Sequence, residues 1–287
     1  MTKDSLHSLI RLALHEDIGP GDLTTSLLIK DGQLAKANVV ARAHMTLSGV
    51  SVFQEVYAIL DPTVEVNALK KDGDTAEMGE TVLSLSGSAA SILTGERTAL
   101  NFLGHLSGIA TYTKAFVDKV EGYPAKILDT RKTTPGLRAL EKEAVLHGGG
   151  VNHRLALFDG ILIKDNHIAA AGGIREALKL AQANFRQKIE IEVDTSAQLM
   201  EALDGGADIV LLDNMDPLAL KEALIQTEAF YHPGQRLTLL EASGGINLEN
   251  VRDAAASGVD FISIGAITHS APNADLGLDF VLEKTNP

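Results

Sequence analysis

The chain has 287 residues, of which 45% are hydrophobic and 22% are charged, so it is long enough to bury one large domain with or without a smaller one. Its formal net charge of −13 at pH 7 argues against a generic nucleic-acid binder, because such proteins are usually basic. The absence of cysteine excludes a disulfide scaffold, a thiol nucleophile and a cysteine-ligated zinc site.

The sequence gives no indication of a membrane or export segment. Charges are scattered through the first residues, which lack the apolar core of a signal peptide. No apolar run approaches the roughly 20 residues that span a bilayer. We therefore expect a soluble cytoplasmic protein that binds neither membrane nor nucleic acid.

The segment before about residue 111 predicts a domain that mixes helices and strands. Apolar residues recur at helical spacing from Leu6 to Leu14, with Asp4 or Ser5 as the cap. Alternation of apolar and polar residues predicts strands within 35–44, 63–69 and 81–88. Helical spacing returns over 92–110, where Arg97 stands in a mostly apolar stretch.

A different pattern begins at about Lys126, where short apolar runs alternate with helical stretches. The runs are "AKILDT", "GILIKDNH", "KIEIEVD", "ADIVLLDN", "LTLLEASGG" and "VDFISIGAITH". Strand, helix and strand at this spacing indicate parallel βα units. No glycine-rich fingerprint follows the first run, so we favour an α/β barrel over a doubly wound sheet.

Each apolar run ends on polar side chains, which a parallel barrel would gather on the face that carries active sites. These residues are Asp129, Arg131, Lys132, Lys164, Asn166, Glu192, Asp194, Asp213, Asn214, Glu241, Ser243, Ser263 and His269.

The basic residues near these runs predict a pocket for anions such as carboxylates and phosphates. They are Arg131, Lys132, Arg138, His153, Arg154 and Lys164. The alternative is a set of surface charges, and Arg138 in particular fits a helix face that carries Glu141 equally well.

Acidic residues at the strand ends predict a second function for the same face. Glu192 and Asp213, and with them Glu241, are suited to hold Mg²⁺ or to accept hydrogen bonds from ribose hydroxyls. The alternative is that Glu190 and Glu192 share one strand face and only contribute to a charge network.

Small residues late in the series favour a phosphate site, because they let backbone amides approach the oxygens. They occur in Ser243–Ile246 and Ser263–His269. The run Gly148–Gly150 fits a turn or an anion-binding loop, and His167 fits a structural role as well as a functional one. The histidine spacing matches no common metal-binding pattern, so we expect no tightly bound transition metal.

The central segment "DTRKTTPGLRALEKEAVLHGGGVNHRLALFDGILIKDNH" closely resembles the quinolinate phosphoribosyltransferases, also called carboxylating nicotinate-nucleotide pyrophosphorylases. The resemblance continues through "IEVD", "VLLDN", "EASGGI" and "SIGAITHS", and upstream through "HEDIGPGDLTT" and "GERTALNFLGHLSGIAT". It spans nearly the whole chain. One departure is Gly104-His105, where the family pattern leads us to expect a polar residue, often Gln.

The resemblance implies an N-terminal α/β sandwich domain over 1–111, with the tail 270–287 packed on it, and an incomplete TIM-like α/β barrel over 112–269. It implies transfer of phosphoribosyl from 5-phosphoribosyl-1-pyrophosphate (PRPP) to quinolinate, with Mg²⁺, giving nicotinate mononucleotide, pyrophosphate and CO₂ in NAD biosynthesis. It also implies a homodimer or a dimer-based oligomer in which Arg97 acts in trans.

The resemblance further implies a role for each matching residue. The quinolinate carboxylates are assigned to Arg131, His153, Arg154, Lys164 and the partner's Arg97, with Lys132 lining the same pocket and contacting pyrophosphate. Glu192 and Asp213 are assigned to the ribose hydroxyls and to Mg²⁺, directly or through water. Ser243, Gly244 and Gly245 are assigned to the 5′-phosphate, with Ser263, Gly265, Ala266 and His269 nearby. The catalytic set is Lys132, Lys164, Glu192 and Asp213.

Three other functions remain open at this point. The first is a related transferase of molybdenum uptake operons, which shares much of the motif set. The second is a Schiff-base aldolase that uses Lys164. The third is a non-catalytic regulator that binds a phosphoribosyl ligand.

Overall fold

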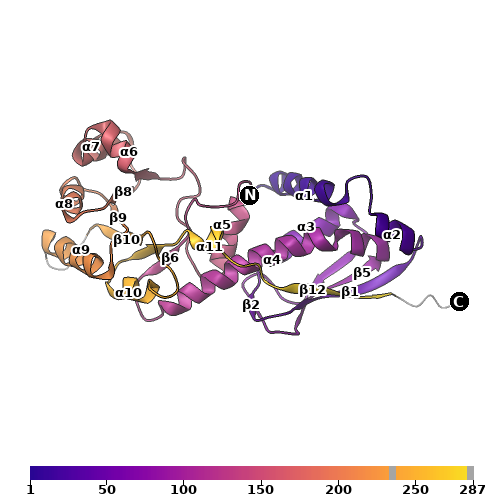
Figure 1. The fold of residues 1–287 in the computed structure, drawn as a ribbon. Coiled ribbons are helices and arrows are strands. Elements are labelled where there is room, and N and C mark those ends of the chain that lie inside the picture. Colours follow the sequence, from indigo (N-terminus) through magenta and orange to yellow (C-terminus); the bar gives the residue numbers. More distant parts are fainter. Residues whose placement is uncertain (233–236, 283–287) are drawn as a thin grey trace. The chain divides into compact units, whose positions relative to one another are not determined.

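The computed structural model describes residues 1–232 and 237–282, drawn in Figure 1. The chain forms two compact units. The first contains residues 1–114, 134–149 and the segment from residue 271, and the second contains residues 115–133 and 150–270. The boundaries 1–111 and 112–269 stay a prediction, and residues 283–287 of the predicted tail lie outside the described residues.

The first unit is built on a four-stranded antiparallel sheet with the order β12-β1-β5-β3, accompanied by the short pair β2-β4. Its helices are α1 (Lys3–Ile18), α2 (Leu23–Leu28), α3 (Val50–Leu60), α4 (Ala89–Lys119, whose last residues enter the second unit) and α5 (Arg138–His147). Its strands are β1 (Leu34–Ala41), β2 (Met45–Thr46), β3 (Glu65–Ala68), β4 (Thr75–Ala76), β5 (Thr81–Ser88) and β12 (Leu276–Leu282).

The C-terminal segment completes this sheet. β12 pairs with β1 along its whole length, from Ala41 opposite Leu276 to Ala35 opposite Leu282. The segment reaches the sheet by crossing α4 at Gly108, where a Cβ would lie 2.1 Å from the carbonyl oxygen of Pro272. A glycine is therefore required at this crossing.

The second unit is a six-stranded parallel sheet with the order β6-β11-β10-β9-β8-β7. Its strands are β6 (Lys126–Leu128), β7 (Ile161–Ile163), β8 (Ile189–Val193), β9 (Ile209–Asp213), β10 (Leu239–Ser243) and β11 (Phe261–Ser263). Its helices are α6 (Asp165–Ala171), α7 (Ile174–Asn184), α8 (Ser196–Asp204), α9 (Pro217–Phe230), α10 (Val251–Ala256) and α11 (Ala266–His269).

The strand order is that of an incomplete barrel. Neighbouring strands from β7 to β11 follow one another in the chain, and β6 then lies beside β11, so the described sheet ends at β6 and β7. Figure 1 shows helices α7 to α10 ranged along the outside of this sheet. The predicted α/β fold, an incomplete parallel barrel with a separate N-terminal unit, is confirmed.

Strand alternation determines which side chains face the inside of the barrel. In β8, Ile189, Ile191 and Val193 alternate with Glu190 and Glu192, and every residue except Glu192 is buried. Successive side chains of a strand point to opposite faces, so the two glutamates share the inner face. Within 1–232 and 237–282, no helix combines the length and the apolar character needed to cross a membrane.

Candidate active site

A cavity of about 600 Å³ lies at the carboxyl ends of the six parallel strands. Most of the predicted site residues line it: Arg131, Lys132, His153, Arg154, Lys164, Glu192, Asp213, Ser243, Gly244, Gly245 and Ser263. The other lining residues are Thr130, Leu162, Leu211, Asn214 and Glu241. The volume lies in the range of small-molecule sites in proteins.

Sequence reasoning missed the two apolar lining residues, Leu162 and Leu211. Each stands two positions before a polar lining residue, Lys164 or Asp213, and the period of a strand is two. The same alternation that places the polar residue on the inner face therefore also identifies the leucine beneath it.

Three predicted residues stand next to the cavity rather than in its lining. Gly265 precedes α11, and a Cβ there would lie 2.9 Å from Cδ of Lys132 and 3.2 Å from Nε2 of His269. The hydroxyl of Thr268 on α11 donates to the carbonyl of Lys132 at 2.8 Å. Gly265 thus lies against Lys132, which does line the cavity, and Ala266 and His269 follow Gly265 on α11.

Two of the predicted basic residues, Arg97 and Arg138, belong to the first unit. Arg97 lies on α4, has a 64% exposed side chain and lies 3.7 Å from its neighbour Glu96. Arg138 begins α5. The carboxylate of Glu141 on α5 is 2.9 Å from Nε2 of His105 and also accepts the backbone N–H of Thr134. The unexpected His105 is therefore accommodated by a buried glutamate on the neighbouring helix.

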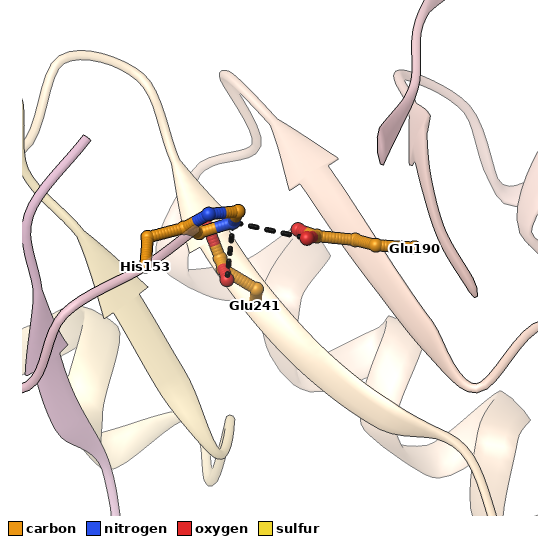
Figure 2. Close-up of side chains that lie close together, drawn as sticks. All are labelled: His153, Glu190 and Glu241. Atoms are coloured by element: carbon orange, nitrogen blue, oxygen red, sulfur yellow. Dashed lines mark ion pairs between the residues drawn. The ribbon is translucent and has the colours of Figure 1, made fainter. Parts of the chain in front are cut away.

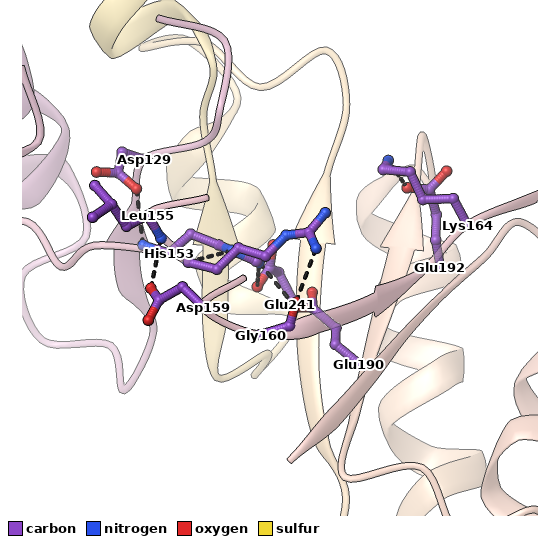
Figure 3. Close-up of polar contacts among 10 residues, drawn as sticks. Asp129, His153, Leu155, Asp159, Gly160, Lys164, Glu190, Glu192 and Glu241 are labelled. Atoms are coloured by element: carbon purple, nitrogen blue, oxygen red, sulfur yellow. Dashed lines mark hydrogen bonds and ion pairs between the residues drawn. The ribbon is translucent and has the colours of Figure 1, made fainter. Parts of the chain in front are cut away.

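Lys164 follows β7 and forms an ion pair with Glu192 of β8, the adjacent strand, as Figure 3 shows. The backbone N–H of Lys164 donates to Nδ1 of His167 at 3.0 Å. His167 therefore caps the start of α6 and fixes the backbone from which the lysine side chain extends. This contact gives His167 a structural role.

His153 lies in the loop before β7, and its backbone N–H and both ring nitrogens contact other groups of the protein. Its backbone N–H donates to Oδ1 of the fully buried Asp129 at 2.8 Å. Its Nδ1 accepts the backbone N–H of Arg154 at 2.7 Å. Its Nε2 lies 2.9 Å from Oε2 of Glu190 and 3.8 Å from Oε2 of Glu241, as drawn in Figure 2.

The sequence predicts that Glu241 ends its strand. The structure instead places it in the middle of β10, where it is 1% exposed. Burial raises the pKa of its carboxyl from 4.5 to about 8, and the negative charge of Glu190 adds to this effect. His153 and Ser263 act in the opposite direction. The carboxyl is therefore protonated at neutral pH, because ionisation is unfavourable in a buried site beside another carboxylate.

Arg154 is half-buried beside a second guanidinium. Its Nη1 donates to the carbonyl of Gly160 at 3.0 Å. Burial lowers the pKa of Arg154 and repulsion from Arg131 lowers it further, whereas the charge of Glu190 raises it. Glu190 thus offsets the repulsion between two arginines on one wall of the cavity.

The turn after β10 requires glycine. Gly244 has φ +91°, and a Cβ there would lie 2.2 Å from Oδ1 and 2.9 Å from the backbone N of Asn214. Asn214 itself has φ 53° and donates its N–H to the carbonyl of Ser243 at 2.8 Å. Gly245 has φ +63°, but nothing lies within 4 Å of its Cβ position. Gly244 therefore allows the turns after β9 and β10 to approach each other.

Gly244→Ala should destabilise the chain more than Gly245→Ala. Both substitutions place a Cβ on left-handed backbone, at a cost of roughly 1 kcal/mol. Only Gly244→Ala adds a clash with Asn214, which should cost a further ~1–3 kcal/mol. Urea unfolding of both variants measures the difference. Equal losses would contradict the close approach of the two turns.

Glu241→Gln should become progressively more stable than the wild type as the pH rises from 4.5 to about 8. Below this window the carboxyl is protonated in both folded and unfolded chains. Within it only the unfolded chain ionises, so the wild type loses stability relative to a variant that cannot ionise. The difference in Tm between the two proteins, measured across this window, should grow. The exposed control Glu222→Gln should show no such trend, and a constant difference for Glu241→Gln would refute the assignment.

Two family models match the chain. "Quinolinate phosphoribosyl transferase, N-terminal domain" matches residues 22–107, and "Quinolinate phosphoribosyl transferase, C-terminal domain" matches residues 109–279. Together they include the whole cavity lining.

Full-length relatives give the same result. The chain is 43% identical to a "probable nicotinate-nucleotide pyrophosphorylase [carboxylating]" of Bacillus subtilis, over 97% of this chain and 94% of that protein. It is 42% identical to the nicotinate-nucleotide pyrophosphorylase [carboxylating] of Mycobacterium leprae, over 96% and 97%. The solved nicotinate-nucleotide pyrophosphorylase of Francisella tularensis superposes with a TM-score of 0.92 at 38% identity, over 98% of both chains. The chain therefore belongs to the quinolinate phosphoribosyltransferase family.

Proposed function

We propose that the chain transfers the phosphoribosyl group of PRPP to quinolinate with loss of CO₂, giving nicotinate mononucleotide and pyrophosphate for NAD biosynthesis. The observation that carries the proposal is the composition of the single cavity described above. It combines arginine and lysine side chains on its walls with carboxylates on two neighbouring strands and a glycine turn at the end of a third. Family membership supports the same reaction.

The basic side chains are suited to a dicarboxylate. Arg131 and Arg154 offer planar guanidinium groups that pair with carboxylates in bidentate fashion. Lys164 adds a point charge from the next strand end. Lys132 and His153 line the same cavity, and Lys132 is assigned to the pyrophosphate of PRPP.

The remaining strand ends are assigned to phosphoribosyl. Ser243, Gly244 and Gly245 offer a hydroxyl and unobstructed backbone amides to the 5′-phosphate, with Ser263 on the adjacent strand. Gly265, Ala266 and His269 extend this region beside Lys132. Glu192 and Asp213 are assigned to the ribose hydroxyls.

The donor chemistry of Glu192 and Asp213 fits Mg²⁺. Both are carboxylates on the cavity wall, and hard oxygen donors of this kind suit a small divalent cation. The side-chain amide of Asn214 donates to Oδ2 of Asp213 at 2.7 Å and orients it. Bound Mg²⁺ would supply charge that stabilises the pyrophosphate leaving group.

The chain's own residues act by positioning and by electrostatics. The bond between C1′ and the pyrophosphate oxygen breaks, the ribose gains oxocarbenium character, and the quinolinate nitrogen forms the new bond to C1′. The carboxylate next to that nitrogen then leaves as CO₂, and the electron pair left on the ring carbon takes up a proton. Cations at fixed positions hold the reactants in line and stabilise the departing charge.

Two further features belong to the proposal. The enzyme acts as a homodimer or a dimer-based oligomer in which Arg97 completes the partner's quinolinate site. It works in the cytoplasm. The exposed position of Arg97 on the first unit supports a role outside that unit.

The rival functions receive less support. The ion pair with Glu192 uses Lys164 as a cation, whereas a Schiff-base aldolase needs a neutral amine. A regulator that only binds phosphoribosyl has no need for carboxylates suited to a metal. The relative from molybdenum uptake operons differs in its acceptor, which an acceptor assay distinguishes.

The proposed function is tested by supplying the full-length protein with Mg²⁺ and PRPP and following nicotinate mononucleotide and CO₂ together. Quinolinate should give both products in equal amounts, and nicotinate should give neither. Turnover of nicotinate, or the absence of product from quinolinate, would reject the proposal.

Arg131→Ala should weaken quinolinate binding much more than PRPP binding, because one bidentate carboxylate contact disappears. A charge-assisted pair contributes about 1.5–3 kcal/mol, so the KM for quinolinate should rise at least roughly ten-fold. Steady-state kinetics with each substrate varied in turn measures the split. Equal changes in both KM values would contradict the assignment of Arg131.

Arg97→Ala and Lys164→Ala should each be nearly inactive alone, and mixing the two proteins should restore activity. A mixed dimer contains one site with both residues intact if Arg97 is supplied by the partner. Activity should approach roughly a quarter of wild type per site after random exchange of subunits. A mixture that stays inactive while subunit exchange is demonstrated would place Arg97 in its own subunit's site.

A further inference from the structure

Both ring nitrogens of His153 contact other groups of the protein. Nδ1 accepts the backbone N–H of the next residue, Arg154, at 2.7 Å. A nitrogen that accepts a hydrogen bond carries no proton, so the proton of the ring is on Nε2. Nε2 faces Glu190 at 2.9 Å, within hydrogen-bond distance of its carboxylate. The structure therefore selects the neutral Nε2–H tautomer.

The two glutamates that face Nε2 come from strands that are not neighbours. Glu190 is on β8 and Glu241 is on β10, with β9 between them. Their side chains are 7% and 2% exposed, and that of His153 is 13% exposed. Figure 2 shows the imidazole edge directed between the two carboxyl groups. The ring thus joins its loop to two strands from inside the barrel.

This arrangement fixes Arg154 at two points. Its backbone N–H is held by Nδ1 of His153, and its Nη1 is held by the carbonyl of Gly160. The charge of Glu190 also favours the Arg154 cation against the repulsion of Arg131. The cluster therefore fixes the direction of a guanidinium that lines the cavity, and Glu190 offsets the repulsion on it.

We propose that His153 is a positioning residue rather than a substrate ligand. Glu190 accepts its Nε2–H, Glu241 lies beside the same nitrogen, and its Nδ1 sets the backbone of Arg154, so that the Arg154 guanidinium is directed at a substrate carboxylate. Glu190 is at the same time the counter-charge that lets Arg131 and Arg154 share one wall. The effect on substrate rests on the proposed function, whereas the tautomer does not.

The same three side chains have the composition of a metal site, since their ligand atoms all lie within 4.8 Å of one another. Two features oppose that use. Two guanidinium groups act on this region, and a buried divalent cation beside them would be repelled. The Nδ1 contact also gives Nε2 a proton that a metal would have to displace. The test below includes this alternative.

The tautomer is tested by long-range ¹H–¹⁵N NMR of the ¹⁵N-histidine-labelled full chain, with the His153 signals assigned through His153→Gln. The expected pattern is an unprotonated Nδ1 and a protonated Nε2, and the exposed His232 serves as the comparison ring. Adding Zn²⁺, which is diamagnetic, should leave this pattern in place. A protonated Nδ1, or loss of the Nε2 proton on adding metal, would overturn the proposal.

The positioning role is tested with paired variants. Asn offers an oxygen where His153 has Nδ1, so His153→Asn should keep a quinolinate KM within roughly three-fold of wild type, and His153→Ala should raise it roughly ten-fold or more. Glu190→Gln keeps a hydrogen-bond acceptor and should be milder than Glu190→Ala. The KM for PRPP should change less than two-fold throughout, and Glu222→Gln on the exposed face of α9 should match wild type.

Equal losses for His153→Asn and His153→Ala, or equal changes in both KM values, would reject positioning and return His153 to direct contact with substrate. If the wild type shows no turnover of quinolinate, the proposed function fails. The NMR pattern still decides the tautomer in that case, so the two failures are distinguishable.

Discussion

The candidate site depends on how the second unit accommodates several cations at one end of a barrel. Burial and repulsion from Arg131 both lower the pKa of Arg154. A buried carboxylate, Glu190, offsets that repulsion. Glu192, two residues later on the same strand and nearer its carboxyl end, forms an ion pair with Lys164. The two glutamates of "IEIEV" thus support different cations from one face of one strand. Without them the basic cavity would be electrostatically unfavourable.

The fold is well suited to this arrangement. Parallel strands present their carboxyl ends on one side, so residues far apart in sequence line a single cavity. Side chains one layer deeper, such as Glu190 and Glu241, are enclosed by the strands and buried. The side chains at the strand ends can then contact a ligand, while the buried side chains beneath them hold those side chains in place. The loop from Asn152 to Gly160 connects the two layers through His153.

The sequence predicted the fold class and most of the cavity lining because both depend on local pattern. Strand period and the polar ends of apolar runs were sufficient to place Lys164, Asp213 and Ser243. The same reasoning placed Glu241 at a strand end, although it lines the cavity from the middle of its strand. It did not reveal that β8 and β10 both direct a glutamate at the imidazole of His153, because nothing in a linear sequence shows this. That convergence depends on strand order and barrel curvature, which only the folded chain reveals.

The most direct test of this account is a crystal structure of the full-length protein with quinolinate. The account predicts that the two carboxylates lie among Arg131, Arg154 and Lys164, while Nε2 of His153 remains on Glu190. Quinolinate bound elsewhere than in this cavity would contradict the assignment of the site. A carboxylate paired with Nε2 of a His153 ring turned away from Glu190 would contradict the positioning role.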